Sequence, residues 1–107
     1  MNADRRIALV IHNVRSAANV GSMLRTADGA GVSQVWLSGY TPAPAAADCR
    51  YPTAAERALA KTALGAERSV LWHRCRSIGT VLERLHTEGY RLVALEQSDG
   101  SISAEEA

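Results

Sequence analysis

The chain has 107 residues, of which 47% are hydrophobic and 21% charged, and its formal net charge is +1. This size and composition are typical of one globular domain with a single modest core. They exclude a strongly basic nucleic-acid binder of the kind that net charge alone reveals, and no apolar run reaches the ~20 residues that cross a bilayer. Because residues 1–6 lack the pattern of a cleaved secretion signal, we expect a cytoplasmic location.

The first predicted elements are a strand and a helix. Residues 7–11 form a continuous apolar run with β-branched members, typical of a parallel strand that is buried on both faces. From about residue 19, apolar side chains recur at helical spacing, at Val20, Met23, Leu24 and Ala27. Gly29 and Gly31 predict the end of this helix. Residues 32–37 return to strand character.

A long loop and a second helix follow. Residues 40–52 contain all three prolines and a run of alanines, which predicts a surface loop. Thr53 can cap the next helix, and Glu56, three residues later, would complete a capping box. Ala58, Leu59 and Ala63 form the apolar face of that helix, which ends towards Gly65.

The last predicted elements are two strands that flank a third helix. Residues 70–72 read as a short strand, and residues 90–96 as a fourth strand. Between them, Ser77 is a candidate helix cap and Gly89 marks the helix end. The apolar stripe of this helix consists of Ile78, Val81, Leu82 and Leu85. We expect no packed element after Gly100, because only seven small or polar residues remain.

This alternation of strands and helices predicts an α/β fold. Strands joined through helices make right-handed crossovers, which give a mainly parallel sheet with helices on both faces. We expect residues 1–107 to belong to a single domain.

Polar residues cluster between the first strand and the first helix, at Asn13, Arg15, Asn19 and Arg25. Ligands of open parallel sheets collect at the carboxyl ends of strands, and a helix N-terminus favours an anion. Arg25 falls opposite the apolar stripe of the helix, whereas Asn19 and Ser22 lie on its flank. The plainer interpretation is that Ser16 or Asn19 only caps the helix, that Gly21 is incidental and that Arg25 is a solvated charge.

The string N-x-R-x-x-x-N-x-G-x-x-x-R-T-A-D, which starts at Asn13 and is followed by Gly31 and Val32, resembles the first motif of the SpoU/TrmH branch of the SPOUT methyltransferases. The resemblance covers residues 13–32 closely and residues 61–66 and 90–96 more loosely. It implies the N-terminal, Rossmann-like half of a SPOUT α/β-knot domain. The implied activity is methylation of a ribose 2′-hydroxyl in tRNA or rRNA by a homodimer that uses S-adenosylmethionine.

The resemblance also implies roles for individual residues. The catalytic residues would be Asn19 and Arg25, and the RNA-binding residues would be Asn13, Arg15 and Ser22. A small part of the S-adenosylmethionine site would lie at Leu95, Glu96 and Gln97. No metal site is implied, and Cys49, Cys75 and the three histidines have no metal-ligand spacing.

Two later motifs of the family are absent from this sequence, namely a Gly-x-Glu-x-x-Gly loop and a proline-led segment with Ser-Leu-Asn-Val-Ser character. The knot-forming part, which holds most of the methyl-donor pocket, is therefore missing. We expect the 107 residues to be inactive by themselves, and to be unstable or self-associating because apolar surface is left uncovered.

Two other functions stay open. The chain could be a non-catalytic RNA-binding module that keeps the arginine surface. A generic nucleotide-binding domain fits less well, because no G-x-G-x-x-G loop follows the first strand. We expect Trp36 and Trp72, at strand positions, to serve the core.

Overall fold

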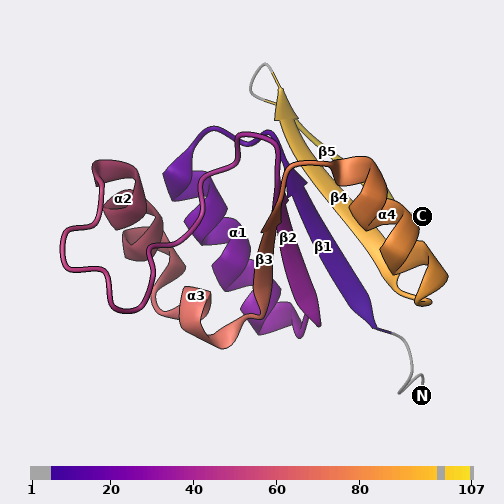
Figure 1. Ribbon diagram of the computed structural model, residues 1–107, viewed down its shortest axis with the longest axis horizontal. Helices are drawn as coiled ribbons and strands as arrows, with labels where there is room; N and C mark the ends of the chain where they lie inside the picture. The colour runs from indigo at the N-terminus through magenta and orange to yellow at the C-terminus, as the bar shows by residue number, and fades with distance from the viewer. Residues whose placement is uncertain (1–5, 99–100, 107) are drawn as a thin grey trace.

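The computed structural model describes residues 6–98 and 101–106, and it gives side-chain positions for residues 6–95. Strands and helices alternate along the chain, except that α3 follows α2 and β5 follows β4 directly (Figure 1). The elements are β1 (Ile7–His12), α1 (Ala17–Ala30), β2 (Gln34–Ser38), α2 (Ala54–Ala63), α3 (Ala66–Ser69), β3 (Trp72–Cys75), α4 (Ile78–Thr87), β4 (Arg91–Ser98) and β5 (Ser101–Glu106). Among the described residues, no helix is both long enough and apolar enough to cross a membrane.

The strands form one sheet in the order β3-β2-β1-β4-β5. Strands β1 to β4 are parallel, and β1 lies at the centre, where Val10 pairs with Trp36 of β2 and Ala94 of β4. This arrangement confirms the predicted α/β fold with a mainly parallel sheet.

The prediction that nothing folds after Gly100 is wrong. Strand β5 pairs antiparallel with β4, from Ser98 opposite Ser101 to Val93 opposite Glu106. Such pairing needs only main-chain hydrogen bonds to the free edge of β4, so small and polar residues can supply it without an apolar face of their own.

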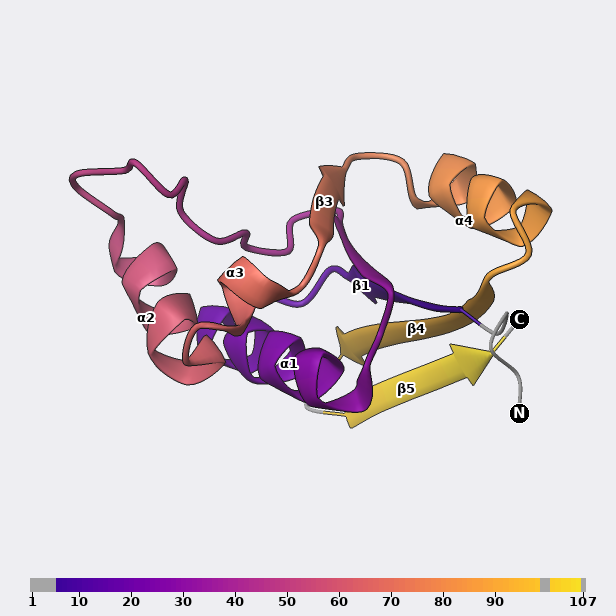
Figure 2. The ribbon, with the colours of Figure 1, turned by 90° about the horizontal axis from the view of Figure 1, so that it is seen from below.

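Helices cover both faces of the sheet, as predicted (Figure 2). One core joins α1, α2 and α3 to the face that carries Leu9, Ile11 and Leu37. The other packs α4, through Val81 and Leu85, against the opposite face. Trp36 belongs to this second core, and Trp72 packs against the first, which confirms the roles expected for both.

The third strand begins later than predicted. Residues 70–72 were expected to form it, but Val70 caps the short helix α3 and β3 spans Trp72–Cys75. The two apolar residues at 70 and 71 differ in burial, since Val70 is buried and Leu71 is 57% exposed. Pairing with β2 starts only where Trp72 meets Val35.

The predicted helix ends are largely confirmed. Thr53 and Glu56 form the capping box of α2, with the hydroxyl of Thr53 accepting from the Glu56 N–H at 3.1 Å. Gly31 ends α1 in the left-handed conformation, with φ of 72°. Ser77 precedes α4 as expected, but its side chain makes no capping hydrogen bond to the helix backbone.

Candidate functional site

The polar residues singled out in the sequence meet where β1 and β2 end. Asn13 follows β1 with φ of 54°, a left-handed conformation that asparagine tolerates better than most residues. Its N–H donates to the carbonyl of Ser38 at 3.2 Å, and its Oδ1 accepts from the N–H of Tyr40 at 3.2 Å. Asn13 therefore ties the turn after β1 to the turn after β2.

The turn after β2 is held closely against Asn13. Gly39 has φ of 66°, and a Cβ there would overlap the Asn13 side chain. The hydroxyl of Thr41, which is 1% exposed, lies 2.8 Å from the carbonyl of Ser38 and accepts from the N–H of Val14 at 3.2 Å. The exposed bond from Tyr40 to Asn13 and the buried bonds of Thr41 thus hold the backbone around Tyr40.

Arg15 is exposed beside this turn. Its guanidinium carbon lies 5.2 Å from the centroid of the Tyr40 ring, within the range of a cation–π contact. His12, at the end of β1, has a structural contact, since its Nδ1 lies 2.9 Å from the hydroxyl of Ser38.

Ser16 is the residue that caps α1. Its hydroxyl accepts from the N–H of Asn19 at 3.1 Å, so of the two residues that could cap the helix it is Ser16 that does. The helix therefore begins at Ala17, two residues before the expected position. The half-buried side chain of Asn19 borders a groove on the β4 side of α1.

Gly21 has a definite packing role, contrary to the interpretation that it is incidental. A Cβ at this position would overlap the hydroxyl of Thr62 and the carbonyl of Leu59, both in α2. The Thr62 hydroxyl lies 2.7 Å from the carbonyl of Ala18. Glycine is required here because it lets the backbones of α1 and α2 approach each other closely.

Arg25 lies apart from Asn19. The two residues are six positions apart in the helix, which separates them by about 9 Å along the axis and about 120° around it. Arg25 is exposed on the solvent side of α1, as its position opposite the apolar stripe predicts, whereas Asn19 borders the groove. The structure thus places Asn13 and Arg15 together at the turns, and Asn19 and Ser22 together at the groove.

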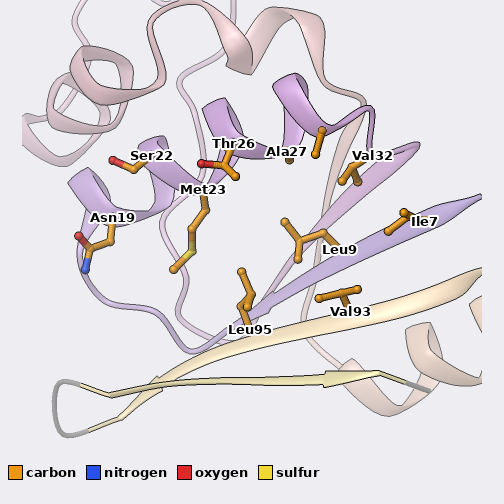
Figure 3. Close-up of a pocket in the computed structure, with 11 residues that line it drawn as sticks. Ile7, Leu9, Asn19, Ser22, Met23, Thr26, Ala27, Val32, Val93 and Leu95 are labelled. Atoms are coloured by element: carbon orange, nitrogen blue, oxygen red, sulfur yellow. The ribbon is translucent and has the colours of Figure 1, made fainter.

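The groove runs between α1 and strands β1 and β4 (Figure 3). It has a volume of about 510 Å³. Met23 extends from α1 towards Leu95 on β4, and polar side chains of α1 lie along one rim. The lining residues are Ile7, Leu9, Asn19, Ser22, Met23, Thr26, Ala27, Ala30, Val32, Val93 and Leu95.

This groove does not fit S-adenosylmethionine. The donor carries a sulfonium, an amino group and a carboxylate, whereas the groove is aliphatic apart from Asn19, Ser22 and Thr26. Of the residues expected to hold the donor, Leu95 lines the groove, while the side chains of Glu96 and Gln97 lie outside the described residues. The side chains that the structure places do not form a donor pocket by themselves.

The cysteines of the described part do not add a metal site. Cys49 and Cys75 are both free thiols, and partial burial raises the pKa of Cys75 above its ordinary value. Within residues 6–95, no three histidine, cysteine or acidic side chains come together as a metal site.

Sequence comparison matches residues 6–107 to the SpoU rRNA methylase family. An uncharacterized tRNA/rRNA methyltransferase of Synechocystis is 30% identical over 89 residues, which are 83% of this chain and 29% of that protein.

Solved structures with the same fold include two of the SpoU methyltransferase AviRb from Streptomyces viridochromogenes. The structure of AviRb in complex with AdoMet gives a TM-score of 0.64 at 14% identity, covering 90% of this chain and 43% of the other. An rRNA methyltransferase from Sinorhizobium meliloti gives a TM-score of 0.56 at 20% identity, covering 74% of this chain and 27% of the other. The present chain thus spans less than half the length of each of these relatives, and it belongs to the SpoU rRNA methylase family.

Proposed function

We propose that the protein containing this chain methylates a ribose 2′-hydroxyl of tRNA or rRNA, with S-adenosylmethionine as methyl donor. The observation that carries the proposal is the first motif, whose polar residues lie at the carboxyl edge of the sheet and along α1. Ligands of parallel sheets bind at this edge. We further propose that the full-length protein is a cytoplasmic homodimer.

The residues of this chain suit the RNA side of the reaction. A ribose hydroxyl is a poor nucleophile, so the site must orient it and hold the neighbouring phosphate. Arg25, which is exposed on α1, clamps that phosphate, and its charge stabilises the developing alkoxide, since a guanidinium hardly deprotonates. Asn19 orients the hydroxyl, and Arg15 and Ser22 bind the RNA backbone.

Asn13 acts differently from the other proposed RNA-binding residues. Its main-chain N–H and its Oδ1 are both bonded to the turn after β2. We therefore propose that Asn13 shapes the RNA-binding edge, and that any contact of its side chain with RNA is made by the amide NH₂ group.

Residues other than those whose side chains the structure places would make most of the contacts with the methyl donor. The groove beside Leu95 lacks the charged and polar groups that the donor needs. We therefore propose that residues 1–107 alone have no turnover, and we assign no step of the transfer to their contact with the donor.

Substitution of Arg25 tests this function. In the full-length protein, Arg25→Ala should lower methyl transfer to the cognate RNA by at least ~10²-fold, because the positive charge that clamps the phosphate and stabilises the alkoxide is lost. Nucleoside mass spectrometry of the RNA measures both the amount and the position of the methyl group. Arg84→Ala is the matched control, since Arg84 is exposed on α4, across the sheet from α1, where it contacts Glu88 at 3.2 Å and the Trp36 ring at 6.0 Å from its centroid.

Two results would contradict the proposal. Near-normal turnover of Arg25→Ala would show that Arg25 of the first motif does not take part in methyl transfer. A methyl group on a base would exclude ribose methylation.

The second candidate is a non-catalytic RNA-binding module. The poor fit of the groove to the methyl donor favours it for the chain by itself. Calorimetric titration with S-adenosylmethionine and with tRNA distinguishes the two functions. Binding of both by the full-length protein supports the enzyme, whereas binding of RNA alone supports the module.

A further inference from the structure

We propose that Arg15 and Tyr40 together form a stacking site for an unpaired RNA base next to the methylated ribose. The proposal rests on the proposed function and adds to it a recognition residue, Tyr40, that lies outside the first motif. We call the two side chains the Arg15–Tyr40 pair.

The first observation is that Tyr40 is an exposed ring on a fixed backbone. Its side chain is 53% exposed and belongs to neither core cluster. Asn13 accepts from its N–H, Gly39 before it contacts the Asn13 side chain, and the buried Thr41 follows it. Because the backbone is already ordered, placing a base on this ring costs little conformational entropy.

The second observation is the chemistry of the neighbour. The guanidinium of Arg15 lies 5.2 Å from the centre of the Tyr40 ring, and both groups are exposed. Aromatic rings and guanidinium planes are the two surfaces on which proteins stack unpaired bases. The same guanidinium can also bind the adjoining phosphate.

Trp36, Trp72 and Tyr90 have structural roles, and Tyr51 is exposed in the loop after β2. Trp36 donates its Nε1–H to Gln34 at 2.6 Å within a core, and Trp72 donates to the carbonyl of Glu67 at 3.2 Å. Tyr90, which also has an arginine over its ring, packs against the core of α4. Tyr40 differs because its ring is exposed at the edge where the first motif lies.

The position of the pair fits a base adjacent to the target nucleotide. Arg15 lies just before α1, with Tyr40 beside it, and Asn19 lies in the first turn of that helix. RNA that crosses the helix N-terminus towards Asn19 and Arg25 therefore passes the pair. A single-stranded loop can turn a base onto it, whereas a duplex cannot.

Binding of a labelled oligoribonucleotide to the full-length protein tests the proposal. The probe is a single-stranded decaadenylate with one 2-aminopurine, whose fluorescence falls when the base stacks. Tyr40→Ala and Tyr40→Leu should weaken binding about 5- to 150-fold and abolish the quenching, because the aromatic face is lost. Tyr40→Phe should bind normally.

Two controls separate stacking from charge and from folding. Tyr51 is 84% exposed in the loop after β2, and Tyr51→Ala should leave binding unchanged. The salt dependence of binding should be unchanged in Tyr40→Ala, whereas Arg15→Ala should lower its slope by about 1, since only the arginine neutralises a phosphate.

Each result decides between the proposals. Normal binding and quenching in Tyr40→Ala and Tyr40→Leu, with weaker binding in Arg15→Ala, would overturn the stacking site and leave the proposed function intact. Equal losses for single-stranded and duplex RNA would also overturn it. If the unsubstituted protein binds no RNA, the proposed function fails and the stacking site fails with it.

Discussion

The two flanks of α1 are packed in different ways. Towards α2, Gly21 brings the helices into backbone contact, and Leu59 and Ala63 are fully buried. Towards β4, aliphatic side chains line an open groove of about 510 Å³ (Figure 3). The flank towards α2 is thus covered by other residues of the same chain. The other is apolar without cover from the described residues, which is typical of a surface that packs against further protein.

The largest expected effect is the difference in stability between truncating a core side chain on the α2 flank and truncating one that lines the groove. Leu59→Ala should lower the free energy of unfolding by about 2–5 kcal/mol, because it leaves a cavity between α1 and α2. Met23→Ala should cost only about 1 kcal/mol, since the half-buried Met23 faces the groove. Urea unfolding of the 107-residue chain measures both. Equal losses would mean that the groove is covered and that the comparison is wrong.

A pair of glycines in α1 tests the close contact directly. Gly21→Ala should destabilise the chain by about 1–3 kcal/mol, because its Cβ overlaps a backbone carbonyl of α2 that cannot move alone. Gly29→Ala is the matched control: no atom lies within 4 Å of its Cβ, so alanine should stabilise the helix by up to ~1 kcal/mol. Thermal melts of both variants should shift in opposite directions. A stabilising Gly21→Ala would contradict the packing role.

The open flank should make the 107-residue chain self-associate. Sedimentation should show species larger than the monomer as concentration rises, and Met23→Glu should weaken that association about tenfold, or ~1.4 kcal/mol. Leu71→Glu serves as control, because Leu71 is an exposed apolar side chain that does not line the groove. A monomer at all concentrations, with one sharp thermal transition, would count against an uncovered flank.

The smallest effect concerns the hydroxyl that joins α2 to α1. Thr62→Val removes the group that lies 2.7 Å from the carbonyl of Ala18 and should cost about 0.5–1.5 kcal/mol. Thr62→Ser keeps the hydroxyl and should cost less. The reverse order in urea unfolding would show that the methyl group of Thr62, and not its hydrogen bond, matters at this contact.

Several parts of the site could be predicted because their cause lies within a few residues of sequence. Position opposite the apolar stripe predicted the exposure of Arg25. Ser16 was one of the two cap residues considered, and the left-handed Gly31 ends α1 as expected. Asn13, in contrast, was expected only to bind RNA, and its bonds to Ser38 and Tyr40 could not be predicted because their partners lie more than 20 residues away.

The contact of Tyr40 with Arg15 could not be predicted from the sequence either. In the sequence it is one residue of a proline-containing loop, and its spacing from Arg15 indicates nothing. Only the parallel pairing of β1 with β2 brings the turn that holds Tyr40 beside the turn that holds Arg15. The sheet therefore creates the Arg15–Tyr40 pair.

Short stretches of sequence are enough to set the alternation of strands and helices, the capping box at Thr53 and the family to which the first motif belongs, because periodicity, caps and motifs act over short spans. Tertiary structure alone decided three things: strand β5, the glycine contact between α1 and α2, and the groove beside β4. Each depends on which distant surfaces meet. A free strand edge, a neighbouring helix backbone and an unfilled flank are properties of the packed chain, and local residue patterns do not contain them.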